Sequence, residues 1–185
     1  GADSMFGGGG DDTFVIENGF GNDTIHGWST GETNGDLLDL SAVTTDTTVD
    51  LTSADPEAGT GTSGADTLGF VEIENLRLRA GRDTLVLADG SGSDTVDGFD
   101  MTDSGDGSTN DQLDVSGLTD AGGYLVNTAD VTVSDDGSGN AVLTFPNGEA
   151  ITLLGVAPAQ LATTAQLASI GIPQSGAVDG TAGDD

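Results

Sequence analysis

The stretch "GADSMFGGGGDDTFVI", residues 1–16, contains four consecutive glycines followed by two aspartates. Glycine loses more backbone freedom on folding than any other residue, so this run is costly unless a turn or a ligand requires it. The stretch aligns with itself at a shift of nine residues, which places Asp3 on Asp12 and Met5 on Phe14. This self-similarity predicts a repeated unit of one glycine-rich turn and one short strand.

The repeated unit matches the nonapeptide G-G-x-G-x-D-x-U-x, in which U is a large apolar residue. Glycine lets the turn aim carbonyl oxygens at an ion, Asp adds a carboxylate, and the following strand buries U. Looser copies are "GFGNDTI", "GTSGADTL", "AGRDTL" and "DGSGSDTV", and the final "GTAGDD" (Gly180, Gly183, Asp185) begins another. The predicted metal-binding residues are Asp3, Gly7, Gly8, Gly10, Asp12, Gly19, Gly21, Asp23, Asp66, Asp83, Gly90, Gly92 and Asp94.

Composition favours hard cations as ligands. The 185 residues include 32 acids and 3 bases, for a net charge of −29, and this charge repels nucleic acid and anionic membrane surfaces. Without cysteine there is neither a disulfide framework nor a thiolate metal site, and the single His26 cannot form a zinc cluster alone. No apolar run long enough to span a membrane is present, so we expect no membrane insertion. The repeat pattern is cut at both ends, so we expect the chain to be part of a longer polypeptide.

These motifs resemble those of the RTX (repeats-in-toxin) family, whose secreted members carry hemolysin-type calcium-binding repeats. The match covers about residues 1–27 and 61–98 and the last six residues, whereas residues 99–175 carry no nonapeptide. The resemblance implies a parallel β-roll in which two nonapeptides form one coil, with several Ca²⁺ ions between stacked turns. It also implies type I secretion and a chain that stays disordered until it meets external calcium.

A longer duplication is visible in the chain itself. Residues 12–27 align without gaps on residues 83–98, with eight of 16 positions identical, and "DLLDLSAV" (36–43) matches "DQLDVSGL" (111–118). Repeats of this kind stack and cover one another's apolar edges. We therefore expect an all-β fold, a parallel β-roll or β-helix solenoid with an internally duplicated unit.

The later segments predict different β structure and a helix. "VTVSDDGSGNAVLTFPNGEAITLLGV" has the pattern of antiparallel hairpins, and "APAQLATTAQLASIGIP" that of one short helix capping the stack. "TTVDL" and "FVEIENLRLR" are predicted as half-buried strands, with Val71 and Ile73 on one face. The predicted units are 1–60 and 61–120 (two β-roll units), 121–172 (hairpins and helix), and 173–185 (a linker into a further repeat).

Several acids lie outside the nonapeptides. The loops at 31–39 and 103–114 contain Asp36, Asp39, Asp106, Asp111 and Asp114, which are acidic enough to hold calcium but do not fit EF-hand spacing. We interpret both as solvated loops, with calcium binding as the alternative. The three arginines, Arg77, Arg79 and Arg82, are expected to neutralise nearby acids.

The sequence thus predicts a protein that is not an enzyme. The acids are accounted for by turn positions, and no nucleophile has a base beside it except through His26. We expect a secreted or cell-surface, calcium-binding structural module: a scaffold, adhesin, surface-layer or filament segment that contacts neighbouring repeats or other copies. The alternative is a secretion and folding module of a larger RTX toxin or hydrolase whose catalytic domain lies elsewhere.

Overall fold

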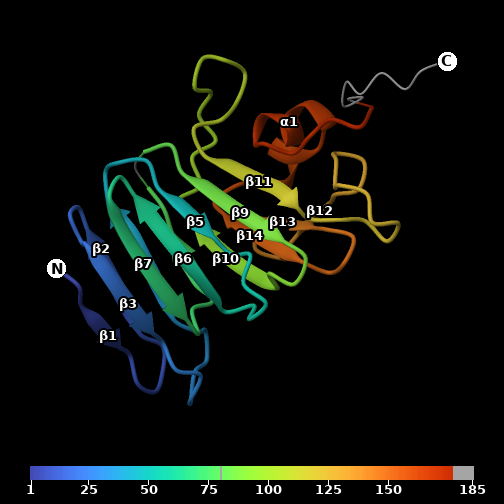
Figure 1. Ribbon diagram of the computed structural model, residues 1–185. Coiled ribbons are helices and arrows are strands. Elements are labelled where there is room, and N and C mark those ends of the chain that lie inside the picture. Colours follow the sequence, from blue (N-terminus) through green and yellow to red (C-terminus); the bar gives the residue numbers. More distant parts are fainter. Residues whose placement is uncertain (80, 177–185) are drawn as a thin grey trace.

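Two β-sheets make up most of the fold. A computed structural model describes residues 1–79 and 81–176, and Figure 1 shows the strands following one another from β1 at one end to β11, β12 and α1 at the other. The first sheet contains, in spatial order, β1 (Ser4–Phe6), β3 (Asn22–His26), β7 (Asp66–Val71), β6 (Ala58–Ser63), β5 (Thr48–Asp50), β9 (Thr84–Ala88) and β11 (Gln112–Gly117). The second sheet contains β12 (Thr132–Asp135), β13 (Ala141–Thr144), β14 (Ala150–Leu154), β10 (Ser93–Asp97), β8 (Asn75–Arg77), β4 (Leu37–Ala42) and β2 (Thr13–Glu17). The all-β prediction is confirmed.

Consecutive strands alternate between the two sheets along much of the chain. β1 and β3 pair in parallel in the first sheet, and β2 and β4 pair in parallel in the second. The same alternation recurs from β8 to β11, where β8 pairs with β10 and β9 with β11, again in parallel. Each such strand is short and places alternate side chains inward, as period-two burial in β2 and β9 illustrates.

The duplicated segments have the same local pairing but lie in opposite sheets. Asp12–Gly27 supplies β2 of the second sheet and β3 of the first, whereas Asp83–Gly98 supplies β9 of the first and β10 of the second. β2 pairs with β4 as β9 pairs with β11, and both pairs contain a register shift near their ends. The two similar segments therefore pair with their neighbouring strands in the same way, although the corresponding strands belong to different sheets.

Antiparallel segments interrupt the parallel pattern in both sheets. β5, β6 and β7 form an antiparallel meander in the first sheet, and β12, β13 and β14 form one in the second, as the hairpin pattern predicts. "GTSGADTL" forms the β6–β7 hairpin, in which Ser63 pairs with Asp66. Its interpretation as a turn between parallel strands is therefore wrong, and β6 was not expected from the sequence.

The segment "FVEIENLRLR" does not form one strand. β7 ends at Val71, and Glu72 adopts a left-handed backbone conformation with φ 56 before β8 begins in the other sheet. Ile73 is buried in this crossing, whereas Val71 is half-buried. The apolar alternation shifts phase here, from Val71 and Ile73 to Leu76 and Leu78, because the two halves belong to different strands.

The C-terminal helix is shorter than the sequence predicts. A 3₁₀ turn, η1 (Pro158–Leu161), is followed by α1 (Thr164–Ser169), and the extended N-cap residue Thr163 separates them. The main-chain oxygen of Ile170 accepts a hydrogen bond of 2.7 Å from the Leu113 N–H, so this segment lies along the edge of β11. In the parts of the chain that the structure describes, no helix has the length and apolarity needed to cross a lipid bilayer.

The apolar side chains of both sheets form a single core. Phe14, Leu38 and Leu76 from the second sheet and Ile25 and Leu85 from the first all belong to one buried cluster. Acidic side chains lie on the same inner face at the beginning of the strands.

Candidate metal centre

An acidic residue precedes the core residue of nearly every parallel-paired strand by two positions. Because side chains alternate along a strand, the acid and the core residue point to the same inner face. The acids are Asp3, Asp12, Asp23, Asp36, Asp66, Glu74, Asp83, Asp94, Asp111 and Glu149, and β5 has Thr47 at this position.

Strand pairing brings these acids into two rows, here called the acidic columns. The first acidic column, at the first sheet, contains Asp3, Asp23 and Asp66, then the hydroxyl residues Ser63 and Thr47, then Asp83 and Asp111. The second acidic column, at the second sheet, contains Asp12, Asp36, Glu74, Asp94 and Glu149 on five consecutive strands. Neighbouring strands lie about 4.8 Å apart, so the second column holds like charges close together without a neutral residue between them.

One oxygen of a column carboxylate typically accepts a main-chain hydrogen bond from the preceding strand of its sheet. In the second column, the Asp12 N–H donates to Asp36 Oδ1 at 2.7 Å, and the Asp36 N–H donates to Glu74 Oε2 at 2.6 Å. In the first column, the Asp83 N–H donates to Asp111 Oδ1 at 2.9 Å. These hydrogen bonds hold the carboxylates in place at the N-terminal ends of the strands.

The second oxygen of several column carboxylates has no partner. Asp12 Oδ2, Asp36 Oδ2, Asp94 Oδ2 and Glu149 Oε2 are buried without a hydrogen bond among the described residues. The exposed fraction is 0% for Asp36 and 5% for Asp94. An ionised carboxylate that is buried without a partner costs several kcal/mol, so these oxygens need a proton or a cation.

Burial raises the pKa of column carboxyls. Removal from water, and then the neighbouring charge of Glu74, raises the pKa of Asp94 to about 7. Removal from water, and then the charge of Asp111, raises the pKa of Asp83 to about 7. The pKa of Asp36 is also raised, chiefly by burial. At neutral pH, ionisation of these carboxyl groups therefore lowers the stability of the metal-free fold.

The ion pairs of the described residues lie outside the columns. Arg77 donates to Asp39 at 3.0 Å and to Asp97 at 2.9 Å, which confirms the prediction of local neutralisation for this arginine. Arg82 lies 4.0 Å from Asp106. The columns thus have no basic side chain paired with them within residues 1–79 and 81–176.

Glycines allow oxygen atoms to gather beside the columns. A Cβ on Gly7 would fall 2.6 Å from Asp12 Oδ2 and 2.9 Å from the Gly27 carbonyl oxygen. A Cβ on Gly27 would overlap Asp36 Oδ2 and the main-chain oxygen of Glu72. Carboxylate and carbonyl oxygens are the ligands of Ca²⁺, and the unpartnered carboxylate oxygens lie beside main-chain carbonyl oxygens at these two glycines.

The structure places the sequence-predicted residues in both columns. Asp3 lies beside Asp23, whose Oδ1 accepts a hydrogen bond of 2.9 Å from the Asp3 N–H, and not beside Asp12, as an 18-residue coil predicts. Asp66 joins the same column, because its Oδ1 accepts from the Gly21 N–H at 3.2 Å. The predicted glycines Gly8, Gly10, Gly19, Gly21, Gly90 and Gly92 all have positive φ. The "GTAGDD" repeat lies outside the described residues.

The nonapeptide motif does not mark four of the column acids: Asp36, Glu74, Asp111 and Glu149. The interpretation of the two acidic loops as solvated is wrong for Asp36, Asp39 and Asp111, which are 0%, 8% and 1% exposed. Asp106, by contrast, is exposed and accepts hydrogen bonds from Ser104 and Ser108. The signal that marks all four is an acid two residues before the first buried apolar residue of a strand, with no requirement for preceding glycines.

The columns offer single carboxylates from successive strands. Within the described parts of the chain, no three His, Cys, Asp or Glu side chains converge as a ready-made metal cluster. Any ion here would therefore draw on main-chain carbonyls as well as on carboxylates. Comparison with models of known protein families gives no match, and no curated protein matches the chain significantly.

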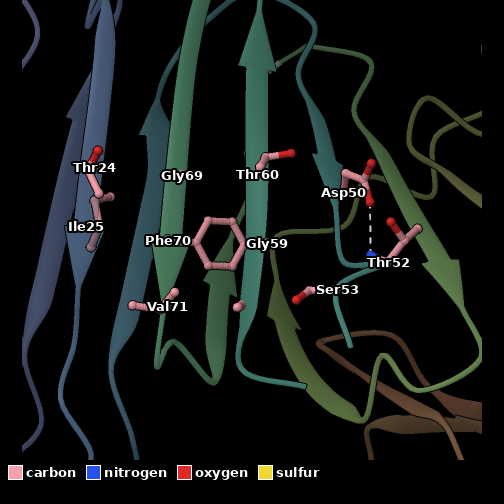
Figure 2. Close-up of a pocket in the computed structure, with 11 residues that line it drawn as sticks. Thr24, Ile25, Asp50, Thr52, Ser53, Gly59, Thr60, Gly69, Phe70 and Val71 are labelled. Atoms are coloured by element: carbon pink, nitrogen blue, oxygen red, sulfur yellow. Dashed lines mark hydrogen bonds between the residues drawn. The ribbon is translucent and has the colours of Figure 1, made fainter. Parts of the chain in front are cut away.

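A second candidate site is an open groove of about 410 Å³ at the first sheet. Figure 2 shows its lining, where Phe70 faces Gly59, and Thr24 and Thr60 flank it. Asp50 is the one titratable side chain among the lining residues, and it accepts a hydrogen bond of 2.9 Å from the Thr52 N–H. The groove thus brings together fewer reactive groups than the acidic columns do.

Proposed function

We propose that this chain is a calcium-binding structural module of a secreted or cell-surface protein. Its parallel strands would form a β-roll in which several Ca²⁺ ions lie along the acidic columns, between successive turns. The module folds when it binds calcium and serves as a scaffold, adhesin, surface-layer or filament segment beside other repeats.

One observation carries this proposal: buried carboxylate oxygens without partners are present at four of the five acids of the second acidic column. Asp12, Asp36 and Asp94 each have one, and a chance loss of a single hydrogen bond would not recur at several acids of one column. Calcium accepts six to eight oxygen ligands at about 2.3–2.6 Å with flexible geometry, which suits carboxylates and carbonyls on strands about 4.8 Å apart. The net charge of −29 supplies the repulsion that calcium relieves.

Circular dichroism in chelator, followed by calcium, tests the proposal. The metal-free chain should be expanded and largely disordered at neutral pH, and β structure should form at about 10⁻⁴ to 10⁻³ M calcium, the range of extracellular modules. Magnesium at equal concentration should stabilise far less, because it requires a small octahedral shell and retains its water. An unchanged β spectrum in excess chelator, or equal effects of the two ions, would contradict specific calcium binding.

A matched pair of variants separates binding at the columns from general charge screening. Asp36→Asn keeps the Oδ1 that accepts from the Asp12 N–H but removes the buried charge, so it should weaken calcium-induced folding. Asp136→Asn makes the same chemical change at an exposed hairpin turn and keeps the acceptor of the Ser138 N–H. If both variants raise the calcium midpoint equally, the columns are not the binding sites.

A further inference from the structure

The last parallel pair of the second sheet joins two different kinds of structure. β10 follows the nonapeptide turn that contains Gly90 and Gly92, whereas β14 follows the β13–β14 hairpin turn of residues 145–149. The chain between residues 99 and 175 has no nonapeptide, so the turn before β10 lacks a second nonapeptide turn beside it on this side. Glu149 occupies the corresponding position.

Glu149 is built into the turn before β10. Glu149 is 6% exposed, and its Oε1 accepts a hydrogen bond of 2.9 Å from the Gly90 N–H. Its Oε2 is buried and has no partner among the described residues. Asp94, which is 5% exposed on the adjacent strand, has an unpartnered Oδ2. Two buried acids on neighbouring strands thus each retain one unused oxygen.

The register between β10 and β14 is staggered at the acidic positions. Ser93 pairs with Ala150, so Glu149 lies opposite Gly92, two residues before Asp94 on the same inner face. Elsewhere in the column the acids are directly opposite, as in the β2–β4 pair, where Thr13 faces Leu37 and both acids come one residue earlier. The additional methylene of Glu149 lets its side chain extend past Gly92 to the Gly90 N–H, and Gly92 itself packs against Pro56, because a Cβ on it would fall 2.4 Å from Pro56 Cβ.

We propose that Asp94 and Glu149 bind one hard divalent cation, calcium in the extracellular setting, between the β9–β10 turn and the β13–β14 hairpin. This site deepens the proposed function and rests on it. It uses a ligand from outside the nonapeptide repeats, and main-chain carbonyls of the glycine-rich turn complete the oxygen shell. Its effect is to join the antiparallel β12–β14 unit to the parallel strands.

Calcium stoichiometry in the full chain tests this site. Glu149→Gln keeps the Oε1 acceptor for the Gly90 N–H and removes the charge, and Asp94→Asn removes the other ligand. Equilibrium dialysis and isothermal titration calorimetry should show that each variant binds one calcium ion fewer than the parent chain, and that the double variant also loses only one. Glu17→Gln, at an exposed position at the end of β2, should keep the parent stoichiometry.

Three results would overturn the inference. Glu149→Gln could bind as many ions as the parent, the double variant could lose two ions, or Glu17→Gln could lose the same ion. Glu149→Asp guards against a folding defect, because it keeps the charge but shortens the reach, and it should weaken this site at least tenfold while the remaining ions bind as in the parent. A parent chain that binds no calcium at all would instead refute the proposed function.

Discussion

Replacing Asp83 by Asn should stabilise the metal-free fold and weaken the calcium-bound one. Asp83 is 3% exposed, and its Oδ1 accepts a hydrogen bond of 2.8 Å from the Thr47 N–H, which an Asn Oδ1 can also accept. The substitution therefore removes the buried charge while keeping the size and the acceptor. Without calcium the buried charge destabilises the fold, whereas in the proposed calcium-bound fold it would be a ligand.

The pKa of Asp83 sets the size of the effect. Burial, and then the charge of Asp111, raises this pKa from 3.8 to about 7. A raised acid pKa means that the folded chain binds the proton more tightly, so the penalty is absent below pH 3.8, grows as pH rises, and is complete above pH 7. At about 1.4 kcal/mol per pH unit, the penalty is about 4 kcal/mol at pH 8 and less than about 2 kcal/mol at pH 5.

Urea unfolding followed by circular dichroism measures this effect, with a fixed concentration of a stabilising osmolyte in calcium-free buffer. Asp83→Asn should raise the free energy of unfolding by about 4 kcal/mol at pH 8 and by about half of that or less at pH 5. Glu17→Gln, the exposed control, should change it by less than about 0.5 kcal/mol. In excess calcium the sign should reverse for Asp83→Asn. A gain that is equal at both pH values, or no gain at pH 8, would refute the electrostatic argument.

Three further substitutions test a close backbone approach beside the columns, a double ion pair and a helix cap. Gly27→Ala should destabilise the chain by about 1–3 kcal/mol or more in urea unfolding, because its Cβ would overlap a carbonyl and a buried carboxylate oxygen, whereas Gly69→Ala, with open space at its Cβ, should cost less than about 1 kcal/mol. Arg77→Gln breaks two ion pairs and should lower the melting temperature more than Arg82→Gln does, because Arg82 is more exposed and its ion pair is longer; equal losses would show that the double pairing adds nothing. Thr163→Ala removes the N-cap of α1 and should cost about 1 kcal/mol, and an unchanged free energy of unfolding would show that this cap does not hold the helix.

The sequence predicts the parallel strands well because their signal is local. Asp3 and Asp23 share a column as the 18-residue coil predicts, since glycine and aspartate spacing fixes where each turn ends and which face each side chain takes. The antiparallel β12–β14 unit is also predicted, because its turns contain Gly and Pro between alternating segments.

What the sequence did not predict depends on contacts between distant residues. Asp36 and Asp111 have the composition of solvated loops, and only pairing with β2 and β9 buries them. The hairpin at Ser63 and Asp66 resembles a nonapeptide turn until the position of β6 is known. The crossing at Glu72 lies where the apolar alternation shifts phase, from Val71 and Ile73 to Leu76 and Leu78, and this shift alone does not distinguish a crossing between sheets from a β-bulge.

The hydrogen bonds along the acidic columns have one direction. In each case the N–H belongs to the earlier part of the chain and the carboxylate to the later, as from Asp12 to Asp36, from Asp83 to Asp111 and from Gly90 to Glu149. Shortening the fold from its N-terminal side would therefore leave behind acceptors, which water at the new edge can solvate. Shortening it from the C-terminal side would leave main-chain donors without their acceptors beside an uncovered core, which is the costlier loss. Loss of strands is therefore expected to cost more free energy at the C-terminal side than at the N-terminal side. The main-chain donors before each of these strands need a carboxylate from a later part of the chain.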